Sequence, residues 1–348
     1  MGIGDLICLT PALKGIRDFY SHAHIALVAS QDSTRQLMEH SSLVDELLAM
    51  PPGEGLTWRR LVWGIAVARR QWDLVVASHH GTNLVAITLL SRAPFRVGIV
   101  EYTGRWQAPL PYVYNLPISV PGIEHRSRSN MRILRALGIP VPDVPRAALE
   151  IPQRAHDQAR VFLEQLAAKP AQPLVILQPG SSAGQHWKSW PSERFVRLAA
   201  LLQDELDAAV VAAGSPDEDE LMRQQLSGVL SDNQIAAGKL DLLATASLIQ
   251  QADLFVGNDS GLAHVAGAVG TRAVVIFGPT DPRICKPLGE GHRILQADLD
   301  CQPCFFYGPS QNQAAAACHR ECLSAIELER VVGACQECLH DSANSTEI

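Results

Sequence analysis

The sequence contains no uninterrupted apolar run of the ~18 residues that a membrane-spanning helix needs. It also lacks the basic stretch and apolar core with which a secretory signal peptide begins. Acidic residues outnumber basic ones by 36 to 29, and the net charge of −7 argues against nucleic acid as the main partner. We therefore expect a cytoplasmic globular protein without a transmembrane segment.

Cysteine is scarce along most of the chain, because Cys8 is the only one before residue 285. The other seven cysteines lie from residue 285 onward. In a reducing compartment, such a cluster is more typical of metal binding or of free thiols than of disulfides. Two close pairs have a spacing compatible with one structural zinc or iron site: Cys301-x2-Cys304 and Cys318-x3-Cys322.

A chain of 348 residues suggests about two domains, at roughly 150 residues each. Short apolar runs predict buried strands, and they alternate with amphipathic stretches that predict helices. This alternation is typical of parallel sheets with helices on both faces. Strands are predicted at 24–30, 73–78, 95–99, 173–179, 208–214, 253–258 and 273–278, and helices at 33–40, 61–70 and 154–168.

A proline-rich stretch at 138–152, GIPVPDVPRAALEIP, interrupts the alternation and predicts a linker. It separates two similar α/β halves, which we place at 1–157 and 158–348. Ligands of such proteins bind outside the carboxyl ends of the strands, and we expect a site there and in the cleft between the halves.

The most informative stretch is DLFVGNDSGLAHVAGAVGTRAVVIFGPTDP, at 253–282. A buried strand ends here, and a helix with small residues opens at Ser260 and Gly261. The free N–H groups of its first turn can bind an anion, and Gly261 allows a phosphate to approach the backbone. We predict Asp259 as the N-cap and place His264 near the mouth of the site. The alternative is that Asp259 only caps the helix and His264 is a packed core residue.

A second strand ends in PGSS, and the loop that follows it carries Lys188 before WPSERF begins a helix with Ser192 as its predicted N-cap. The hydroxyl groups of Ser181 and Ser182 and the mobile charge of Lys188 suit a diphosphate. A solvated loop lysine is the alternative.

Two shorter stretches are candidates for the rest of a nucleotide site. Acidic residues at 217–220 follow a strand, where a carboxylate can hold ribose hydroxyls, although they can equally form the acidic first turn of the next helix. Lys239 and Leu240 can border an adenine ring.

The candidate acceptor loop is SHHGTN at 78–83, with His79 and His80, which can also be ordinary loop histidines. Three arginines can meet an anionic acceptor or can simply be solvated: Arg105, Arg126 and Arg128.

Three stretches, in this order, resemble glycosyltransferase family 9, the ADP-heptose:lipopolysaccharide heptosyltransferases of GT-B fold. They are GDLICLTPALKGIR at the start, PGSS…KSWPSERF in the middle and GNDSGLAHVAGAVGT…FGPTDP later. The resemblance covers almost the whole chain. It implies two Rossmann-like domains facing a central cleft, with the acceptor on 1–157 and the nucleotide sugar on 158–348. It also implies a cytoplasmic enzyme of lipopolysaccharide biosynthesis, and contact with the inner face of the inner membrane stays open.

The resemblance assigns roles position by position. Asp5 matches the catalytic base, and Ser181, Ser182 and Lys188 match the residues that hold the donor diphosphate. Leu240 matches the residue beside the adenine. The start of the donor-binding helix is matched by Asp259, Ser260, Gly261 and His264.

An inverting transfer of heptose or a related sugar from an ADP-sugar to a lipopolysaccharide core or other glycan follows from the resemblance. Asp5 would take the proton of the attacking acceptor hydroxyl, while Lys188 and the helix N-terminus would stabilise the departing diphosphate. No metal or other cofactor is needed for this step. Two alternatives remain: an epimerase of the same fold that acts on a nucleotide sugar, and a non-catalytic sugar-nucleotide-binding protein.

One part of the family pattern is missing. In the family a strand of the type ILVVRL runs into the Gly-Asp loop, whereas here only Met1 precedes Gly2. Without that central strand, the apolar edges of its neighbours would be exposed. We expect a truncated or misassigned start, which leaves the identity of Asp5 unaffected but its rigidity open.

Overall fold

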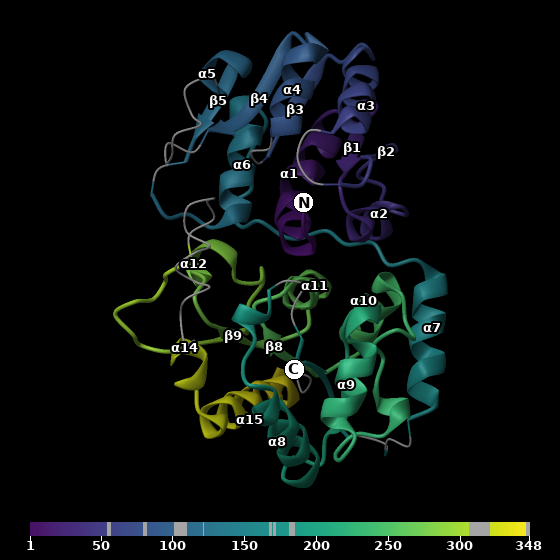
Figure 1. Ribbon diagram of the computed structural model, residues 1–348, viewed down its shortest axis with the longest axis vertical. Coiled ribbons are helices and arrows are strands. Elements are labelled where there is room, and N and C mark those ends of the chain that lie inside the picture. The colour runs from purple at the N-terminus through teal and green to yellow at the C-terminus, as the bar shows by residue number, and fades with distance from the viewer. Residues whose placement is uncertain are drawn as a thin grey trace. The chain divides into compact units, whose positions relative to one another are not determined.

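The computed structural model describes residues 1–53, 57–78, 82–100, 110–120, 122–166, 169, 172–180, 185–305 and 321–345. The chain forms two compact units, Met1–Ala148 and Leu149–Ile348. Both are α/β (Figure 1), and the paired strands of each described sheet are parallel. The prediction of an α/β protein with parallel sheets is therefore confirmed.

The amino-terminal unit contains two separate sheets. β1 (Ala26–Ala29) pairs with β2 (Glu46–Ala49), and β4 (Phe95–Val100) lies between β3 (Leu74–Ala77) and β5 (Leu116–Ser119). Its helices are α1 (Ile3–Phe19), α2 (Asp32–Met38), α3 (Trp58–Ala68), α4 (Thr82–Ser91), α5 (Leu110–Val113) and α6 (Arg126–Ala136). The sequence pattern misses β2 and β5, because both are short and contain residues that weaken a strand prediction, a glutamate and a proline.

The expected Gly-Asp loop near the start of the chain is helical instead. α1 begins at Ile3, so Asp5 lies in its first turn, where a carboxylate faces the positive end of the helix dipole. Pro11 lies inside this helix and cannot donate to the carbonyl of Ile7. The Thr10 hydroxyl donates to that carbonyl at 2.8 Å and so replaces the missing backbone bond. α1 can therefore remain continuous through its proline.

α1 is buried along its middle, at consecutive positions from Leu6 to Leu13. Burial raises the pKa of the Cys8 thiol to about 12, which makes this cysteine unreactive. Asn130 of α6 donates its side-chain amide to the Cys8 carbonyl at 3.0 Å and so joins the two helices.

The carboxyl-terminal unit is built on one five-stranded sheet in the order β10-β9-β8-β6-β7. These strands are β6 (Leu174–Gln178), β7 (Ala209–Ala212), β8 (Leu254–Asn258), β9 (Ala273–Phe277) and β10 (Arg293–Gln296). From β6 the chain proceeds outward to β7 on one side and then to β8, β9 and β10 on the other. The strand order therefore reverses between β6 and β8, and ligands of such sheets bind outside the carboxyl ends of the strands at that point.

Helices cover both faces of this sheet. One layer contains α8 (Ser192–Asp204) and α15 (Leu328–Ser345), and the other contains α10 (Leu242–Gln250) and α11 (Gly261–Val269), with α7 (Gln153–Glu164) packed on α10. The remaining short helices are α9 (Asp219–Leu226), α12 (Pro282–Cys285), α14 (Glu321–Ser324) and the 3-10 turns η1 (His186–Lys188), η2 (Pro216–Glu218) and η3 (Asp232–Gln234).

Trp190, which is fully buried, anchors the layer of α8 and α15. Its indole N–H donates to the Ile326 carbonyl at 2.9 Å, and its ring meets Phe195 of α8 edge-on. The predicted N-cap of α8 is wrong, because Pro191 occupies that position and Ser192 is already helical. Among the described residues, no helix is both long enough and apolar enough to cross a membrane.

Two helical glycines of the carboxyl-terminal unit test how tightly α11 is packed. A methyl group on Gly267 of α11 would overlap the backbone carbonyl oxygen of Leu288, whereas one on Gly333 of α15 would meet open space. We expect Gly267→Ala to lower the free energy of unfolding by about 1–3 kcal/mol, as overpacking does. Gly333→Ala should leave it unchanged or raise it by up to about 1 kcal/mol. Urea unfolding of both variants measures the difference, and equal effects would contradict the packing.

Candidate active site

The carboxyl ends of β6, β8 and β9 bring together residues from distant parts of the chain. The Lys188 ammonium lies 3.0 Å from an oxygen of Asp259, and the side chains of the two residues are only 8% and 6% exposed. The Thr280 hydroxyl, in the loop after β9, donates to the same carboxylate oxygen at 2.7 Å. A lysine, an aspartate and a threonine from three loops therefore form one buried polar cluster.

Asp259 does not cap α11, and that prediction is wrong. The N-cap position belongs to Ser260, and the Asp259 carboxylate points instead to Lys188 and Thr280. The backbone N–H of Asp259 donates to the carbonyl of Ile276 at 3.0 Å and so continues the pairing of β8 with β9. Asp259 is thus held by the sheet, and its charge compensates the lysine.

The N-terminus of α11 lies directly beside this cluster. Ser260 makes no side-chain capping bond to the helix, because its hydroxyl donates to the Gln178 side-chain oxygen at 2.7 Å. The first-turn N–H groups of an uncapped helix can bind an anion. Gly261 opens the helix, and His264, only 5% exposed, lies one turn further. The buried position of His264 agrees with either of the alternatives stated for it.

Two amides at strand ends, missed by the sequence interpretation, hold the loops of this site. Asn258 donates to the carbonyls of Pro179 and Gly180, both at 3.0 Å, and accepts from the backbone N–H of Trp190 at 2.9 Å. Gln178 donates to the Gly180 carbonyl at 2.6 Å. The signal that could have found them is an amide as the last residue of an otherwise apolar buried strand.

Lys188 is positioned from a second direction by aromatic stacking. Trp187, its neighbour in η1, lies 4.5 Å from the ring of Phe305, centroid to centroid. The backbone N–H of Phe305 in turn donates to the Pro279 carbonyl at 2.9 Å. The loop that carries Lys188 therefore rests on the segment that contains Cys301 and Cys304.

The acidic residues at 217–220, which follow β7, have two different roles. Asp219 opens α9 and pairs with Arg223 at 2.9 Å, as an acidic first turn does. Glu218 instead turns back toward the strand end, where one of its oxygens accepts from the backbone N–H and the hydroxyl of Ser215 at 2.7 and 2.8 Å. Its side chain lies against Gly180, where an added Cβ would overlap it. The other oxygen, Oε1, is buried and has no hydrogen-bond partner among the described residues.

The two residues predicted beside the adenine lie just before α10. Leu240 is half-buried, and its backbone N–H donates to the Ala236 carbonyl at 3.3 Å. Lys239 is exposed, and its ammonium donates to the carbonyl of Asp232. Of the pair, only Leu240 offers an apolar, partly sheltered surface.

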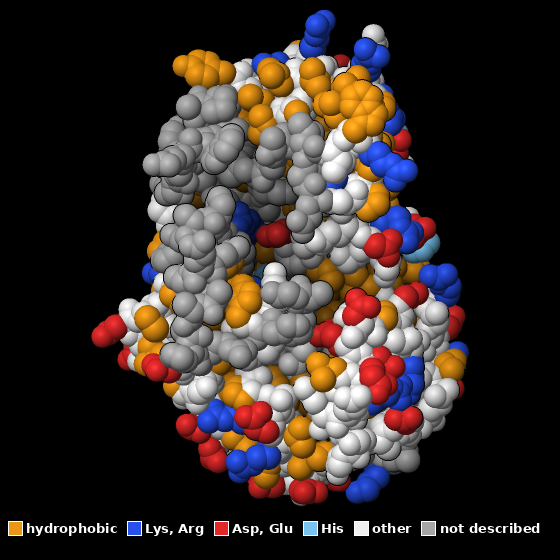
Figure 2. Space-filling view, in the orientation of Figure 1, with side chains coloured by type: hydrophobic (Ala, Val, Ile, Leu, Met, Phe, Trp, Pro, Cys, Tyr) orange, Lys and Arg blue, Asp and Glu red, His pale blue; other side chains and the backbone are white. Residues whose placement is uncertain are grey.

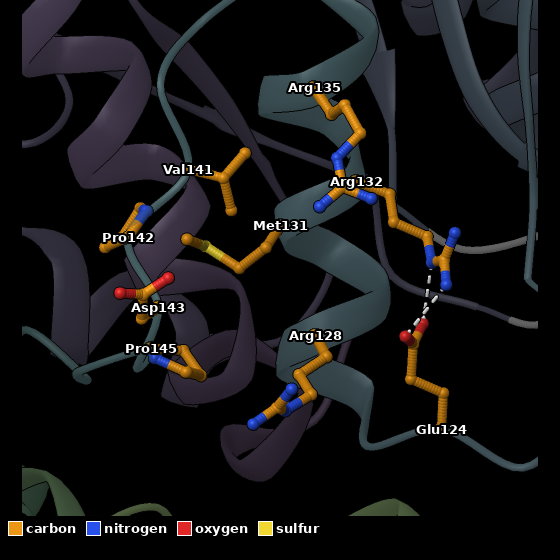
Figure 3. Close-up of a pocket in the computed structure, with 9 residues that line it drawn as sticks. All are labelled: Glu124, Arg128, Met131, Arg132, Arg135, Val141, Pro142, Asp143 and Pro145. Atoms are coloured by element: carbon orange, nitrogen blue, oxygen red, sulfur yellow. Dashed lines mark hydrogen bonds and ion pairs between the residues drawn. The ribbon is translucent and has the colours of Figure 1, made fainter.

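In the amino-terminal unit, Asp5 is open to solvent with 55% of its side chain exposed, and Arg126 of α6 lies 3.9 Å from it. Arg128 is two residues further along α6 and faces elsewhere, because neighbours on one helix face are three or four residues apart. It lines a separate pocket of this unit (Figure 3).

Three arginines of α6 surround the pocket in Figure 3, and the segment between α6 and α7, residues 141–145, closes its other side. Arg132 donates to both oxygens of Glu124, at 2.8 and 2.9 Å, and this pair lowers the pKa of the Glu124 carboxyl. The pocket contains none of the predicted donor residues. Its lining consists of Glu124, Arg128, Met131, Arg132, Arg135, Val141, Pro142, Asp143 and Pro145.

Several predicted residues lie outside the described part of the chain: Ser181, Ser182, His79, His80, Arg105 and Cys318. Of the other cysteines in the predicted metal set, Cys301 is exposed, Cys304 is half-buried and Cys322 is buried. Within the described ranges, no group of three or more His, Cys, Asp or Glu side chains is arranged to hold a metal ion.

Comparison with known proteins gives a curated relative and three solved structures to which the chain is similar. Lipooligosaccharide heptosyltransferase 2 of Haemophilus influenzae is 26% identical over 310 residues, which cover 84% of this chain and 86% of that protein. The structure of a family 9 glycosyltransferase from Veillonella parvula superposes with a TM-score of 0.78 at 22% identity, over 98% of this chain and 95% of that one.

E. coli ADP-heptose LPS heptosyltransferase II superposes with a TM-score of 0.72 at 21% identity, over 99% and 97% of the two chains. An iron-containing dodecameric glycosyltransferase from enterotoxigenic E. coli is more distant, with a TM-score of 0.55 at 16% identity, over 99% of this chain and 75% of that one. These superpositions confirm the predicted GT-B fold.

The sequence model described as glycosyltransferase family 9 (heptosyltransferase) matches residues 63–315, which is well over half of the chain. The match includes Lys188, the end of β8 and the start of α11. The chain therefore belongs to glycosyltransferase family 9.

Proposed function

We propose that this protein is an inverting heptosyltransferase that transfers heptose from ADP-heptose to a lipopolysaccharide core-type acceptor. The observation that carries the proposal is the buried Lys188–Asp259 pair beside the uncapped N-terminus of α11, at the point where the strand order reverses. The names of its relatives supply the sugar and the acceptor, since they are lipopolysaccharide and lipooligosaccharide heptosyltransferases.

The donor diphosphate would lie between Lys188 and the first turn of α11, with Ser260 and Gly261 nearest to it. A cationic side chain and aligned backbone N–H groups both stabilise the negative charge that develops on a departing diphosphate. Ser181 and Ser182 remain proposed ligands of the same group, and His264 a proposed neighbour of it. Asp259 has a supporting role here, because it fixes the Lys188 ammonium in place.

The nucleoside would lie toward β7. The Glu218 oxygen that has no partner among the described residues would accept a hydrogen bond from a ribose hydroxyl, while Ser215 holds the other oxygen. Leu240 provides the apolar contact for the adenine ring. A donor bound in this way would span the carboxyl ends of β7, β6 and β8, which are neighbours in the sheet in this order.

The proposed chemistry is a single displacement at the anomeric carbon. The acceptor hydroxyl forms the new C–O bond, the bond to the diphosphate breaks, and its electron pair leaves with ADP. Asp5 takes the proton of the hydroxyl, and Arg126 lies 3.9 Å from that carboxylate. His79 and His80 are kept as proposed acceptor contacts. The protein would perform this reaction on the cytoplasmic side of the inner membrane. We also propose that it is attached there peripherally.

A structural metal at the cysteines is also part of the proposal. The segments of two of these cysteines meet at the end of β9, because Cys304 donates its backbone N–H to Pro279 at 3.0 Å and Leu323, next to Cys322, lies against Gly278. A zinc or iron ion held by Cys301, Cys304, Cys318 and Cys322 would fix Phe305 beneath Trp187. Its role would be structural, and the chemistry would proceed without it.

Lys188→Ala is expected to weaken ADP binding by about 10- to 100-fold, the effect of losing a charge-assisted hydrogen bond. Adenosine, which has no phosphate, should bind as tightly as it does to the wild type. Calorimetry with ADP, UDP and adenosine measures this, and ADP should bind more tightly than UDP to the wild-type protein.

The Lys188 experiment needs a check on folding, because the variant leaves the Asp259 carboxylate buried without its cation. Losing one partner of a buried ion pair lowers the free energy of unfolding by about 3–5 kcal/mol. A protein unfolded by the change would lose adenosine and ADP together. Lys169→Ala is the matched control, since this exposed lysine pairs with Asp207 in the same unit. ADP affinity within twofold of wild type would show that Lys188 has no role in donor binding.

Asp5→Asn is expected to reduce transfer by about 10²–10⁴-fold and to leave donor affinity unchanged, because the amide keeps the shape of the side chain but cannot take a proton. Turnover is measured with ADP-heptose and a heptose-acceptor core fragment, and donor affinity by calorimetry. Asp18→Asn is the control, an exposed carboxylate on the same helix. More than about a tenth of wild-type turnover in the Asp5 variant would exclude it as the base.

The metal proposal is checked by elemental analysis of reduced, tag-free protein, which should contain about one equivalent of zinc or iron. Cys301→Ser should lose that metal and lower the melting temperature. Cys285→Ser should keep it, because Cys285 lies outside the cluster and a hydroxyl can also donate to the Asp281 carbonyl. Metal-free wild-type protein would leave the cysteines as free thiols.

A further inference from the structure

Three neighbouring helices of the amino-terminal unit turn large apolar side chains toward solvent. α3 packs on α4, and α4 packs on α5. Figure 2 shows hydrophobic side chains following one another over the part of this unit that Figure 1 labels α3, α4 and α5, with basic side chains among them. We call this surface the α3–α5 face, and its exposed apolar residues are Trp58, Val62, Leu89, Leu90 and Tyr112.

α3 buries its small residues and leaves two of its large apolar ones exposed. Its buried residues are small, Gly64, Val67 and Ala68, and Gly64 lies against Ile87 of α4. Its exposed residues include Trp58, which is 74% exposed, and Val62 one turn later. An exposed tryptophan and an exposed valine one turn apart form an apolar surface of the kind that marks an interaction site.

The charge of this region also differs from that of the whole protein. Between residues 57 and 100 the sequence has six arginines and a single acidic residue, Asp73, whereas the full chain has a net charge of −7. Three of these arginines are exposed beside the apolar residues: Arg59, Arg69 and Arg92. The surface is therefore both apolar and positively charged, on a protein that is acidic overall.

We propose that the α3–α5 face docks the protein on an anionic lipid bilayer. Tryptophan and tyrosine prefer the interface between lipid headgroups and hydrocarbon, and arginines beside them bind acidic headgroups. A helix with an aromatic and aliphatic face flanked by arginines lies in that interface rather than across the membrane. This inference rests on the peripheral attachment included in the proposed function and names the face that makes it. It uses none of the residues assigned to donor binding or to catalysis, so vesicle binding and turnover can fail separately.

The test is flotation of the full-length protein with vesicles that contain no glycan. One set contains phosphatidylethanolamine and phosphatidylglycerol, and the other contains phosphatidylcholine alone. The protein is expected to float with the anionic vesicles, to be released by high salt, and to stay in solution with the neutral ones. Wild-type protein that ignores the anionic vesicles, or binds both kinds equally, would overturn the proposal.

Variants locate the contact on the protein. Combining Trp58→Ser with Val62→Ser should weaken vesicle binding by more than about tenfold, because the variant loses the apolar area that these two side chains bury in the bilayer. Arg59→Gln and Arg69→Gln should each weaken it about fivefold. Matched controls are Leu221→Ser and Arg197→Gln, exposed positions of the carboxyl-terminal unit, which should bind as the wild type does.

Two further measurements distinguish a lipid bilayer from two other partners of this face, the glycan acceptor and a second copy of the protein. Turnover with a soluble, lipid-free acceptor should be unchanged in the Trp58→Ser, Val62→Ser variant. A loss there as large as the loss of vesicle binding would show that the face contacts the acceptor instead. Sedimentation should give the same mass for this variant and the wild type, and a wild-type dimer that the substitutions dissociate would identify a second copy as the partner.

Discussion

The buried ion pair between Lys188 and Asp259 is the interaction on which the carboxyl-terminal site depends. Each charge would be strongly unfavourable alone at this depth, and each is tolerated because the other lies 3.0 Å away. The pair joins a loop after β6 to the end of β8, and Thr280 adds the loop after β9 to the same carboxylate. Three strand ends are thus fixed around one charge, and the N-terminus of α11 keeps its orientation next to them.

This arrangement explains why the neighbouring polar groups are amides and hydroxyls rather than further charges. Gln178 and Asn258 can each donate and accept, so they satisfy the carbonyls of Pro179 and Gly180 without adding a charge to a buried site. Glu218 is the exception, since one of its oxygens has no partner among the described residues. A ligand that carries a hydroxyl group could donate the hydrogen bond that this carboxylate oxygen beside Gly180 lacks.

The sequence alone predicted four of the five strands of the carboxyl-terminal unit, because buried apolar runs such as those of β8 and β9 are recognisable locally. It missed β10, which contains an arginine and a glutamine. It also singled out Lys188 and Asp259, since a lysine and a small-residue helix start are recognisable locally. It did not predict that they pair with each other, or that Thr280 joins them. Those contacts depend on which strands are neighbours, and spacing along the chain carries no record of strand order.

The helix of Asp5 shows the opposite kind of error. Gly2 and Gly4 favoured a loop on local propensity, yet the residues that follow them are buried on almost every side, and packing extends the helix back to Ile3.

The same helix is linked to the point where the chain leaves the amino-terminal unit. Thr10, whose hydroxyl replaces the bond that Pro11 cannot make, also accepts the backbone N–H of Ala148, the last residue of the amino-terminal unit. The Thr10 hydroxyl therefore couples the exit of the chain from this unit to the helix of Asp5.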